Sequence, residues 1–300
     1  MDKEWGTQCE AEMKKCLDLL KKYKLGIDLS TYQGNYNMKD LLDIGGSFAI
    51  LRGAYTSKSG PKKVDDKFLT NYNTAKAAKI KVGLYYYSLA KNVKEAKEEA
   101  EFLYNNCLIN KEYELPIYID IEDSGTLKLG KSTVTSIANA FIDHLNSLGY
   151  VGGVYSSISM FNSYFNMSDI HGEIWAASWT QTVPAINNLG MWQFGGEINK
   201  IRSCKINNVI VDQDFMIKDY SYIKTKKLNG FGSNTKTSQV KTCKAVLIQT
   251  ALNYKGYNCG LADGVIGPKT IEQLKKFQVA NKLTSTGECD TKTWNLLIKD

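Results

Sequence analysis

The sequence of 300 residues contains only two histidines and two arginines, and this scarcity excludes several kinds of chemistry. His144 lies within a predicted helix and His171 beside a glycine in a loop, so neither has the neighbours that a Ser-His-Asp or Cys-His enzyme needs. A zinc hydrolase built on several histidines is excluded as well. The net charge of +7 comes almost entirely from lysine, whereas base-specific recognition favours bidentate arginine, so we expect no nucleic-acid partner. Such a charge suits a polyanionic surface, and it suits general solubility equally well.

Other absences concern cofactors, disulfides and membranes. The sequence has no G-x-x-x-x-G-K-[ST] motif and no strand-linked G-x-G-x-x-G, so we expect no nucleotide cofactor. None of the seven cysteines forms a C-x-x-C pair, and we expect no bound metal. Their scattered spacing fits reduced thiols, although a Cys259–Cys289 bridge stays open. With no run of 18 apolar residues, we expect no membrane insertion. Residues 1–24 are charged and lack an apolar core, so we expect synthesis in the cytoplasm without a signal peptide and action after release.

Short apolar runs recur along the first 220 residues and predict eight β-strands. The runs are Leu25–Leu29, Phe48–Gly53, Val82–Ser88, Pro116–Ile121, Gly152–Ser156, Glu173–Ser178, Met191–Phe194 and Val209–Phe215. Helical patterns separate several of them, at residues 64–79, 93–106 and 132–148. Strands that alternate with helices predict a parallel sheet, and eight of them predict a closed β/α barrel. The segments between later strands are shorter, so we expect a reduced layer of helices after residue 152.

The segments that flank this α/β region have a different composition. Apolar side chains at helical spacing over residues 9–24 predict an N-terminal helical extension, residues 1–24, before a barrel at residues 25–223. The stretch 224–240 is polar and rich in Gly, Ser and Thr, which predicts a flexible linker. Residues 241–300 predict a small three-helix domain. Its helices are expected at Cys243–Tyr254, Pro268–Asn281 and Thr291–Ile298.

Four acidic residues fall within or just after these strands. Asp120 and Glu122 end the fourth strand and share one face of it, because side chains alternate along a strand. Asp28 lies near the end of the first strand, and Asp212 lies within the eighth. An isolated D-x-E pair is more often a solvated strand end than a site. Closure of the barrel brings the first and eighth strands together, so we expect all four carboxylates at one mouth, where mutual repulsion raises the proton affinity of one.

Aromatic residues cluster near the same strand ends. They are Tyr85, Tyr86 and Tyr87, Tyr155, Trp179 and Trp192. Aromatic rings beside carboxylates are typical of sugar-binding clefts, because one face of a pyranose is apolar. Alternation places Tyr85 and Tyr87 on one face of their strand and Tyr86 on the other, so these three tyrosines do not all line the cleft.

The sequence resembles the glycoside hydrolase family 25 lysozymes over about residues 25–220. The matching segments are Gly26–Gly34, Phe48–Arg52, Val82–Ser88, Pro116–Glu122, Ile174–Trp179, Trp192–Phe194 and Val211-Asp212. The resemblance implies an irregular TIM-like β/α barrel with eight strands and few helices. It also implies an N-acetylmuramidase that cuts the β-1,4 bond between N-acetylmuramic acid and N-acetylglucosamine. The N-terminal extension departs from the family pattern.

The resemblance also implies roles for individual residues. Glu122 matches the general acid/base, Asp120 matches its partner at the N-acetyl group, and Asp28 and Asp212 match flanking acids of the cleft. The expected substrate-binding residues are Tyr86, Tyr155, Trp179, Gln193 and Arg52. The nucleophile, either the acetamido group of the substrate or an enzyme carboxylate, stays open. A chitinase-type D-x-x-D-x-D-x-E pattern is disfavoured because Leu115 and Tyr118 replace two of its aspartates.

The last 60 residues resemble a peptidoglycan-binding module of the three-helix type. The matching residues are Leu247–Gln249, Asp263–Thr270, Phe277-Gln278, Thr291 and Trp294. We therefore expect a cell-wall lytic lysozyme of the phage or prophage endolysin kind, with bacterial peptidoglycan as the partner of both the cleft and the module. The alternatives are a bacterial autolysin with the same chemistry, a chitin-type glycosidase, and a wall-binding protein without activity.

Overall fold

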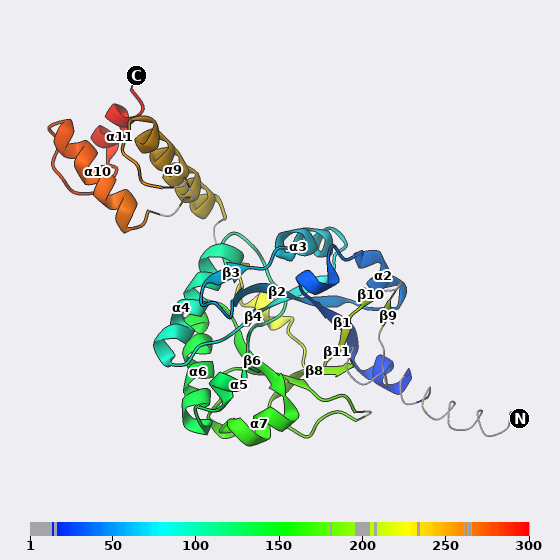
Figure 1. The fold of residues 1–300 in the computed structure, drawn as a ribbon. Helices are drawn as coiled ribbons and strands as arrows, with labels where there is room; N and C mark the ends of the chain where they lie inside the picture. The colour runs from blue at the N-terminus through cyan, green and yellow to red at the C-terminus, as the bar shows by residue number, and fades with distance from the viewer. Residues whose placement is uncertain are drawn as a thin grey trace, which may run out of the picture. The chain divides into compact units, whose positions relative to one another are not determined.

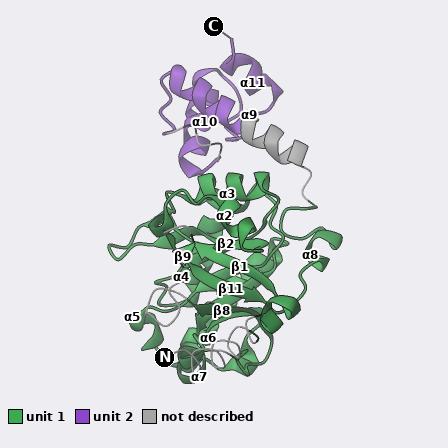
Figure 2. Cartoon of the chain, turned by 90° about the vertical axis from the view of Figure 1, so that its right-hand side faces the viewer, with its two compact units in different colours: residues 1–232 green, residues 233–300 purple. Residues whose placement is uncertain are grey.

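The computed structural model describes residue 14 and residues 17–180, 182–195, 205–206, 209–232, 235–260, 262, 264 and 266–299, without the side chains of Lys205 and residues 235–244. The chain runs through a strand-rich region and then three helices (Figure 1). It divides into two compact units, residues 1–232 and residues 233–300 (Figure 2). No helix in these ranges is both long enough and apolar enough to cross a membrane.

Eight strands close into a barrel in the described part of the first unit. They are β1 (Lys24–Leu29), β2 (Phe48–Thr56), β4 (Lys81–Tyr87), β5 (Ile117–Asp120), β6 (Gly152–Ser157), β7 (Glu173–Ala177), β8 (Leu189–Gly195) and β11 (Asp212–Met216). The order β1-β11-β8-β7-β6-β5-β4-β2 closes through a parallel pairing of β1 with β2. The eight predicted strands and the barrel are therefore confirmed.

One strand departs from the predicted parallel sheet. β11 is antiparallel to both of its neighbours, β1 and β8, whereas the other seven strands are parallel to one another. Two minor additions are β3 (Lys62–Val64), which extends the sheet beside β2, and a separate pair formed by β9 (Lys205–Ile206) and β10 (Val209–Ile210). The antiparallel direction of β11 determines at which end of the barrel its first residue, Asp212, lies.

Helices cover the barrel unevenly. The elements are α2 (Met38–Asp43), α3 (Phe68–Ala77), α4 (Val93–Leu103) with a π turn at Tyr104–Leu108, α5 (Ser124–Leu127), α6 (Lys131–Ser147) and α7 (Ile158–Tyr164). Two 3-10 turns lie at Thr31–Gln33 and Met167–Asp169. The long helices α4 and α6 pack together on one side (Figure 1). No α-helix lies between β7 and β8 in the described residues, so the helical layer is reduced as expected.

Short polar residues fix where these helices begin. Asn92 caps α4 by accepting a hydrogen bond from the backbone N of Glu95, and Asp123 caps α5 by accepting one from Thr126 N. Gly149 follows α6 with φ of +83°, a conformation that favours glycine and ends the helix. Ahead of β1, the described residues are helical at 17–22, within the predicted extension; most of residues 1–16 lie outside the described part.

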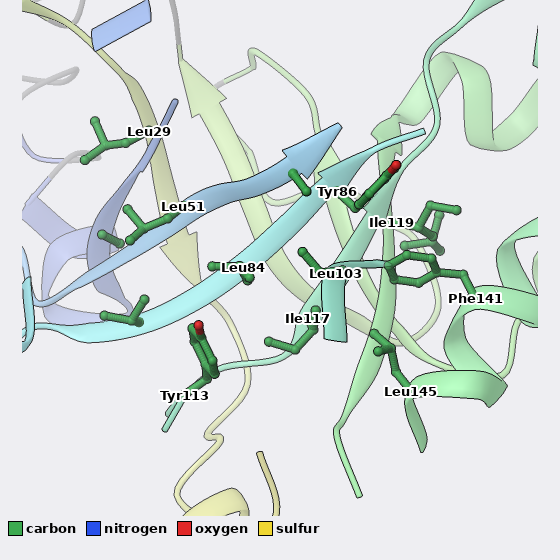
Figure 3. Packing of buried hydrophobic residues seen from close by; sticks show 14 of the residues in the cluster. Leu29, Leu51, Leu84, Tyr86, Leu103, Tyr113, Ile117, Ile119, Phe141 and Leu145 are labelled. Atoms are coloured by element: carbon green, nitrogen blue, oxygen red, sulfur yellow. The ribbon is translucent and has the colours of Figure 1, made fainter. Parts of the chain in front are cut away.

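The core has two layers because side chains alternate along each strand. Outward-facing residues, among them Leu29, Leu51, Leu84 and Ile119, pack against the helices (Figure 3). Inward-facing residues fill the barrel. They are Phe48, Ile50, Tyr118, Tyr155, Trp175, Met191 and Met216. The apolar filling lies towards the amino ends of the parallel strands, which leaves the other end for polar groups.

Residues 222–232 belong to the first unit and overlap the start of the predicted linker, residues 224–240. They include α8 (Tyr222–Thr225) and the fully buried Asn229. The side chain of Asn229 accepts a hydrogen bond from Val151 N at 2.7 Å and donates one to Leu115 O at 2.8 Å. The composition suggested solvated chain, but this asparagine satisfies backbone groups of the barrel instead.

The second unit contains α9 (Thr235–Tyr254), α10 (Pro268–Ala280) and α11 (Thr291–Leu297). The bounds of α10 and α11 agree with the prediction to within one residue, whereas α9 begins eight residues before the predicted start at Cys243. Pro268 occupies the first turn of α10, as expected. The unit's core is formed by Ile248, Leu252, Cys259, Leu274, Phe277 and Leu297, with Trp294 partly buried against it. Cys259 is a free thiol within hydrogen-bonding distance of Gln249 O, so no Cys259–Cys289 bridge forms. Asp263 lies outside the described residues, whereas Gly264 has a φ of +81°.

Candidate active site

Four carboxyl groups meet at one end of the barrel. Asp28 and Asp120 lie at the carboxyl ends of β1 and β5, and Glu122 follows Asp120 by two residues. Asp212 is the first residue of β11, yet it lies at the same end because β11 runs antiparallel and pairs Asp212 with Asp28. The structure therefore brings together the four acids that the sequence placed at one mouth.

Burial and mutual repulsion perturb these carboxyl groups strongly. Burial, and then the charge of Asp212, raises the pKa of Glu122. Burial, and then Glu122, raises the pKa of Asp120, an effect that Arg52 partly opposes. The Oδ1 atom of Asp120 has no hydrogen-bond partner among the described residues. Burial and mutual repulsion both favour the protonated form of a carboxyl group in this cluster, and general acid catalysis requires a protonated carboxyl group.

A fifth carboxyl group, Asp214, lies beneath the other four. It is fully buried, and its Oδ1 accepts a hydrogen bond from Trp175 Nε1 at 2.8 Å. Burial raises its pKa, and so does the charge of Asp212. Asp214 also adds to the repulsion that, after burial, raises the pKa of Asp28. The sequence analysis did not assign Asp214, although alternation from Asp212 would have placed both residues on one face of β11.

Gln193 links these acids to the wall of the cleft. Its Nε2 donates to Asp28 Oδ2 at 2.8 Å, and its Oε1 lies 3.0 Å from the Tyr155 hydroxyl and 3.4 Å from Trp179 Nε1, both of which donate. The side chain is only 3% exposed. Gln193 was predicted to bind substrate, but these contacts engage both ends of its amide, and in this structure it orients Asp28, Tyr155 and Trp179.

A cleft of about 590 Å³ opens above this network. Its lining comprises Tyr32, Gln33, Glu122, Tyr155, Ser157, Ala177, Trp179, Gln193, Ile210 and Asp212. Two of the predicted acids and two of the predicted aromatic residues therefore face the same space. Aromatic surface beside hydrogen-bonding groups suits a sugar, whose ring faces are apolar and whose edges carry hydroxyl groups.

The structure places two other predicted residues elsewhere. Tyr86 does not line the cleft: it points out of the barrel, where its ring packs against Phe141 of α6 and its hydroxyl bonds Thr56 (Figure 3). Tyr85 takes the inward position, edge-on to Trp175. The ring of Trp192, also expected at the mouth, packs in the outer layer.

Arg52 lies near the mouth but is not part of the cleft lining. Its Nε donates to the buried Asp65 at 2.7 Å, and its guanidinium lies 5.2 Å from the centre of the Tyr32 ring and 5.0 Å from that of Tyr55. In this arrangement Arg52 supports Tyr32, and its charge partly opposes the rise that burial and Glu122 cause in the pKa of Asp120.

Tyr32 is a cleft residue that the list of predicted site residues omitted. Its side chain is 84% exposed at the rim, although its backbone is firmly held. Ser30 and Gln33 form a capping box around it, and Thr31 N donates to Asp65 at 3.0 Å. The sequence could have identified Tyr32 as a site residue, because Tyr32 belongs to the segment Gly26–Gly34 that resembles the family. In the described ranges no group of three or more His, Cys, Asp or Glu side chains is arranged to hold a metal ion.

Comparison with known proteins gives two family matches. The model of glycosyl hydrolases family 25 matches residues 27–200, and that of a peptidoglycan-binding domain matches residues 244–297. No curated protein matches the chain.

Several solved structures share the barrel fold. The crystal structure of the CTP1L endolysin is 22% identical, with a TM-score of 0.56 over 68% of this chain and 69% of that one. The catalytic domain of endolysin ply40 from bacteriophage P40 of Listeria monocytogenes is 22% identical, with a TM-score of 0.54 over 69% and 98% of the two chains. A lysozyme from Streptomyces coelicolor is 22% identical, with a TM-score of 0.52 over 71% and 98%.

Proposed function

Because the chain belongs to glycosyl hydrolases family 25, we propose that its barrel cuts the β-1,4 bond between N-acetylmuramic acid and N-acetylglucosamine in bacterial peptidoglycan. One observation carries the proposal: Glu122, its pKa raised by burial and by Asp212, faces a cleft with aromatic walls. A carboxyl group that keeps its proton near neutral pH can protonate the leaving oxygen of a glycosidic bond.

The acids take different parts in this reaction. Glu122 donates its proton to the glycosidic oxygen and then, as a carboxylate, accepts a proton from the attacking water. The family resemblance assigns Asp120 to the acetamido group of the reacting sugar, and its buried Oδ1 has no partner among the described residues. The charge of Asp212 adds to burial in raising the pKa of Glu122, which favours the protonated form. Asp28, held by Gln193, places a further carboxyl group beside the reacting sugar.

Two routes to the same products differ in the nucleophile. Either the acetamido oxygen of the substrate attacks the anomeric carbon, or an enzyme carboxylate does. Glycan strands whose N-acetyl groups have been removed separate the two routes. The substrate-assisted route predicts that these strands are not cleaved, whereas the enzyme-nucleophile route predicts residual cleavage.

The C-terminal module holds the enzyme on its polymeric substrate. Residues 244–297 match a peptidoglycan-binding domain, and the fold of the barrel is shared with the autolysin LytC of Streptococcus pneumoniae, solved with a synthetic peptidoglycan ligand at 22% identity. Tethering a catalytic cleft to a wall-binding module raises the local concentration of cleavable bonds.

We further propose that the protein acts at the bacterial cell wall as an endolysin. The endolysins among the structural relatives support this assignment. A bacterial autolysin would perform the same chemistry after export by its own host. Detection of Sec-dependent export of the intact chain from its native host would exclude the endolysin assignment.

Mass spectrometry of products from purified cell walls tests the reaction. We expect fragments with muramic acid at the reducing end, and no comparable release from chitin oligomers. Glu122→Gln should abolish the release, because an amide cannot donate the proton. Equal release of reducing ends by wild type and Glu122→Gln would contradict the catalytic assignment and favour a wall-binding protein. N-acetylglucosamine at the reducing end would contradict the assigned bond.

A further inference from the structure

We propose that Lys91 is a positioning residue for Glu122. It acts through an ion pair with Asp123 that fastens the turn carrying Glu122 to the loop after β4. This inference rests on the proposed role of Glu122 as the proton donor. The sequence analysis gave neither Lys91 nor Asp123 a role.

Glu122 lies in a short connection between two elements and needs support on both sides. On the preceding side, Ile121 is fixed to β6, because its N–H donates to Tyr155 O at 3.1 Å and its carbonyl accepts from Ser156 Oγ at 2.8 Å. On the following side, Asp123 caps α5 by accepting from Thr126 N at 2.9 Å. The direction of the Glu122 side chain therefore depends on where Asp123 is held.

Lys91 holds the segment that follows Glu122 from a different part of the chain. Its Nζ lies 2.5 Å from Asp123 Oδ2 and 3.0 Å from Thr126 Oγ1. Thr126 is fully buried, and its hydroxyl also lies 3.1 Å from Ala90 O, so the threonine and the lysine join the same two segments. Burial opposes ionisation of Asp123, but the hydrogen bonds from Lys91 and Thr126 outweigh it and lower the pKa of Asp123.

Gly125 leaves the space in which the pair forms. A Cβ atom at this position would lie 2.9 Å from Lys91 Nζ and 2.9 Å from Asp123 Oδ2. Contacts that short do not occur without a shift of the neighbouring atoms, so any side chain at residue 125 would push the ammonium away from the carboxylate. The turn at Gly125 therefore leaves room for the Lys91 ammonium beside Asp123.

The loop that carries Lys91 is itself rigidly anchored. Ser88 N donates to Asp120 O at 3.0 Å, and Lys91 N donates to Glu95 at 2.7 Å. The buried Glu99 of α4, which takes no part in the chemistry, accepts from Ser88 Oγ at 2.5 Å and from Leu89 N at 3.3 Å. A firm anchor allows Lys91 to fix Asp123, and through it Glu122, rather than to follow their motion.

The alternative is that the pair contributes only to stability, as exposed ion pairs often do weakly. Steady-state kinetics on soluble glycan fragments of peptidoglycan, with the full-length protein well below its melting temperature, separates the two. We expect Lys91→Met to lower kcat about 10- to 100-fold, since small misplacements of a reacting group have effects of this size, and to change KM less than about twofold. Lys91→Arg should restore most of kcat.

A second variant and a matched control complete the test. Gly125→Ala should lower kcat in the same way with Lys91 intact, and the double variant Lys91→Met/Gly125→Ala should be no worse than either alone. Lys94→Met removes a lysine in the first turn of α4, three residues beyond Lys91, whose side chain is 87% exposed and pairs with Glu98 at 3.9 Å; this change should leave kcat unchanged. An unchanged kcat for Lys91→Met, or a loss that merely follows melting temperature, would overturn the proposal. Failure of the proposed function would show differently, as a wild type no more active than Glu122→Gln.

Discussion

Asn229 offers a direct test of how the polar segment 222–232 closes the barrel. Replacing it with alanine removes the acceptor of Val151 N and the donor to Leu115 O, and leaves two backbone groups inside the protein without partners. Each such group costs about 1–3 kcal/mol. The residue also has a φ of +50°, where alanine is less favourable than asparagine by about 0.5–1 kcal/mol. We therefore expect Asn229→Ala to lower the free energy of unfolding by about 2.5–7 kcal/mol.

Urea denaturation of the full-length protein, followed by tryptophan fluorescence, measures this change because Trp175 and Trp192 report on the barrel. Asn110→Ala is the matched control: Asn110 has a similar φ of +62° but an exposed side chain, so its replacement isolates the backbone cost. The difference between the two variants should exceed about 2 kcal/mol. A difference below about 1 kcal/mol would refute the view that Asn229 ties the segment to the barrel.

Three other predictions concern the cleft and the module. Asp212→Asn removes the charge that, after burial, raises the pKa of Glu122, so the alkaline limb of the profile of kcat/KM against pH should move to lower pH. A limb that stays in place or moves to higher pH would contradict the effect of Asp212 on Glu122. Tyr32→Ala should raise KM on soluble glycan fragments about tenfold, whereas Tyr32→Phe should keep a KM near that of the wild type, because we expect the face of the ring rather than the hydroxyl to contact the sugar. Equal effects of the two changes would exclude stacking of the ring on the sugar. Residues 233–300 hold ten lysines against five acids, so binding of the full chain to purified walls should weaken as salt is raised from 0.05 to about 0.5 M, and salt-independent sedimentation would show that charge does not contribute.

Strand positions were readable from the sequence because buried strands are short, apolar and β-branched. The acids at their ends followed from the same pattern, since parallel strands in a barrel present their carboxyl ends together. Asp28, Asp120 and Glu122 meet for that reason. Asp212 reaches the mouth for a different one: it begins its strand, and only the antiparallel direction of β11 puts that beginning beside Asp28. Sequence periodicity is the same in both directions and does not reveal strand polarity.

Which way a side chain faces was harder to read. In the run of three tyrosines, a shift of one residue exchanges the inner and outer faces of the strand. The outward position of Tyr86 depends on the register of β4 with its neighbours, which places Tyr85 beside Arg52 inside the barrel. Similarly, the contacts of Gln193 with Asp28, Tyr155 and Trp179 arise only when β8 lies beside the other strands.

The segment that ends in Asp120-Ile121-Glu122 shows what the sequence determines by itself and what depends on the tertiary structure. Its apolar residues and its two acids on one face were determined by the sequence alone, through local burial and alternation. The charge that, after burial, raises the pKa of Glu122 belongs to Asp212, 90 residues further along the chain, and the ion pair that holds Asp123 comes from Lys91 on an earlier loop. Charge interactions and hydrogen bonds act over a few ångströms in space, so only the tertiary structure decided which distant groups set the chemistry of this strand.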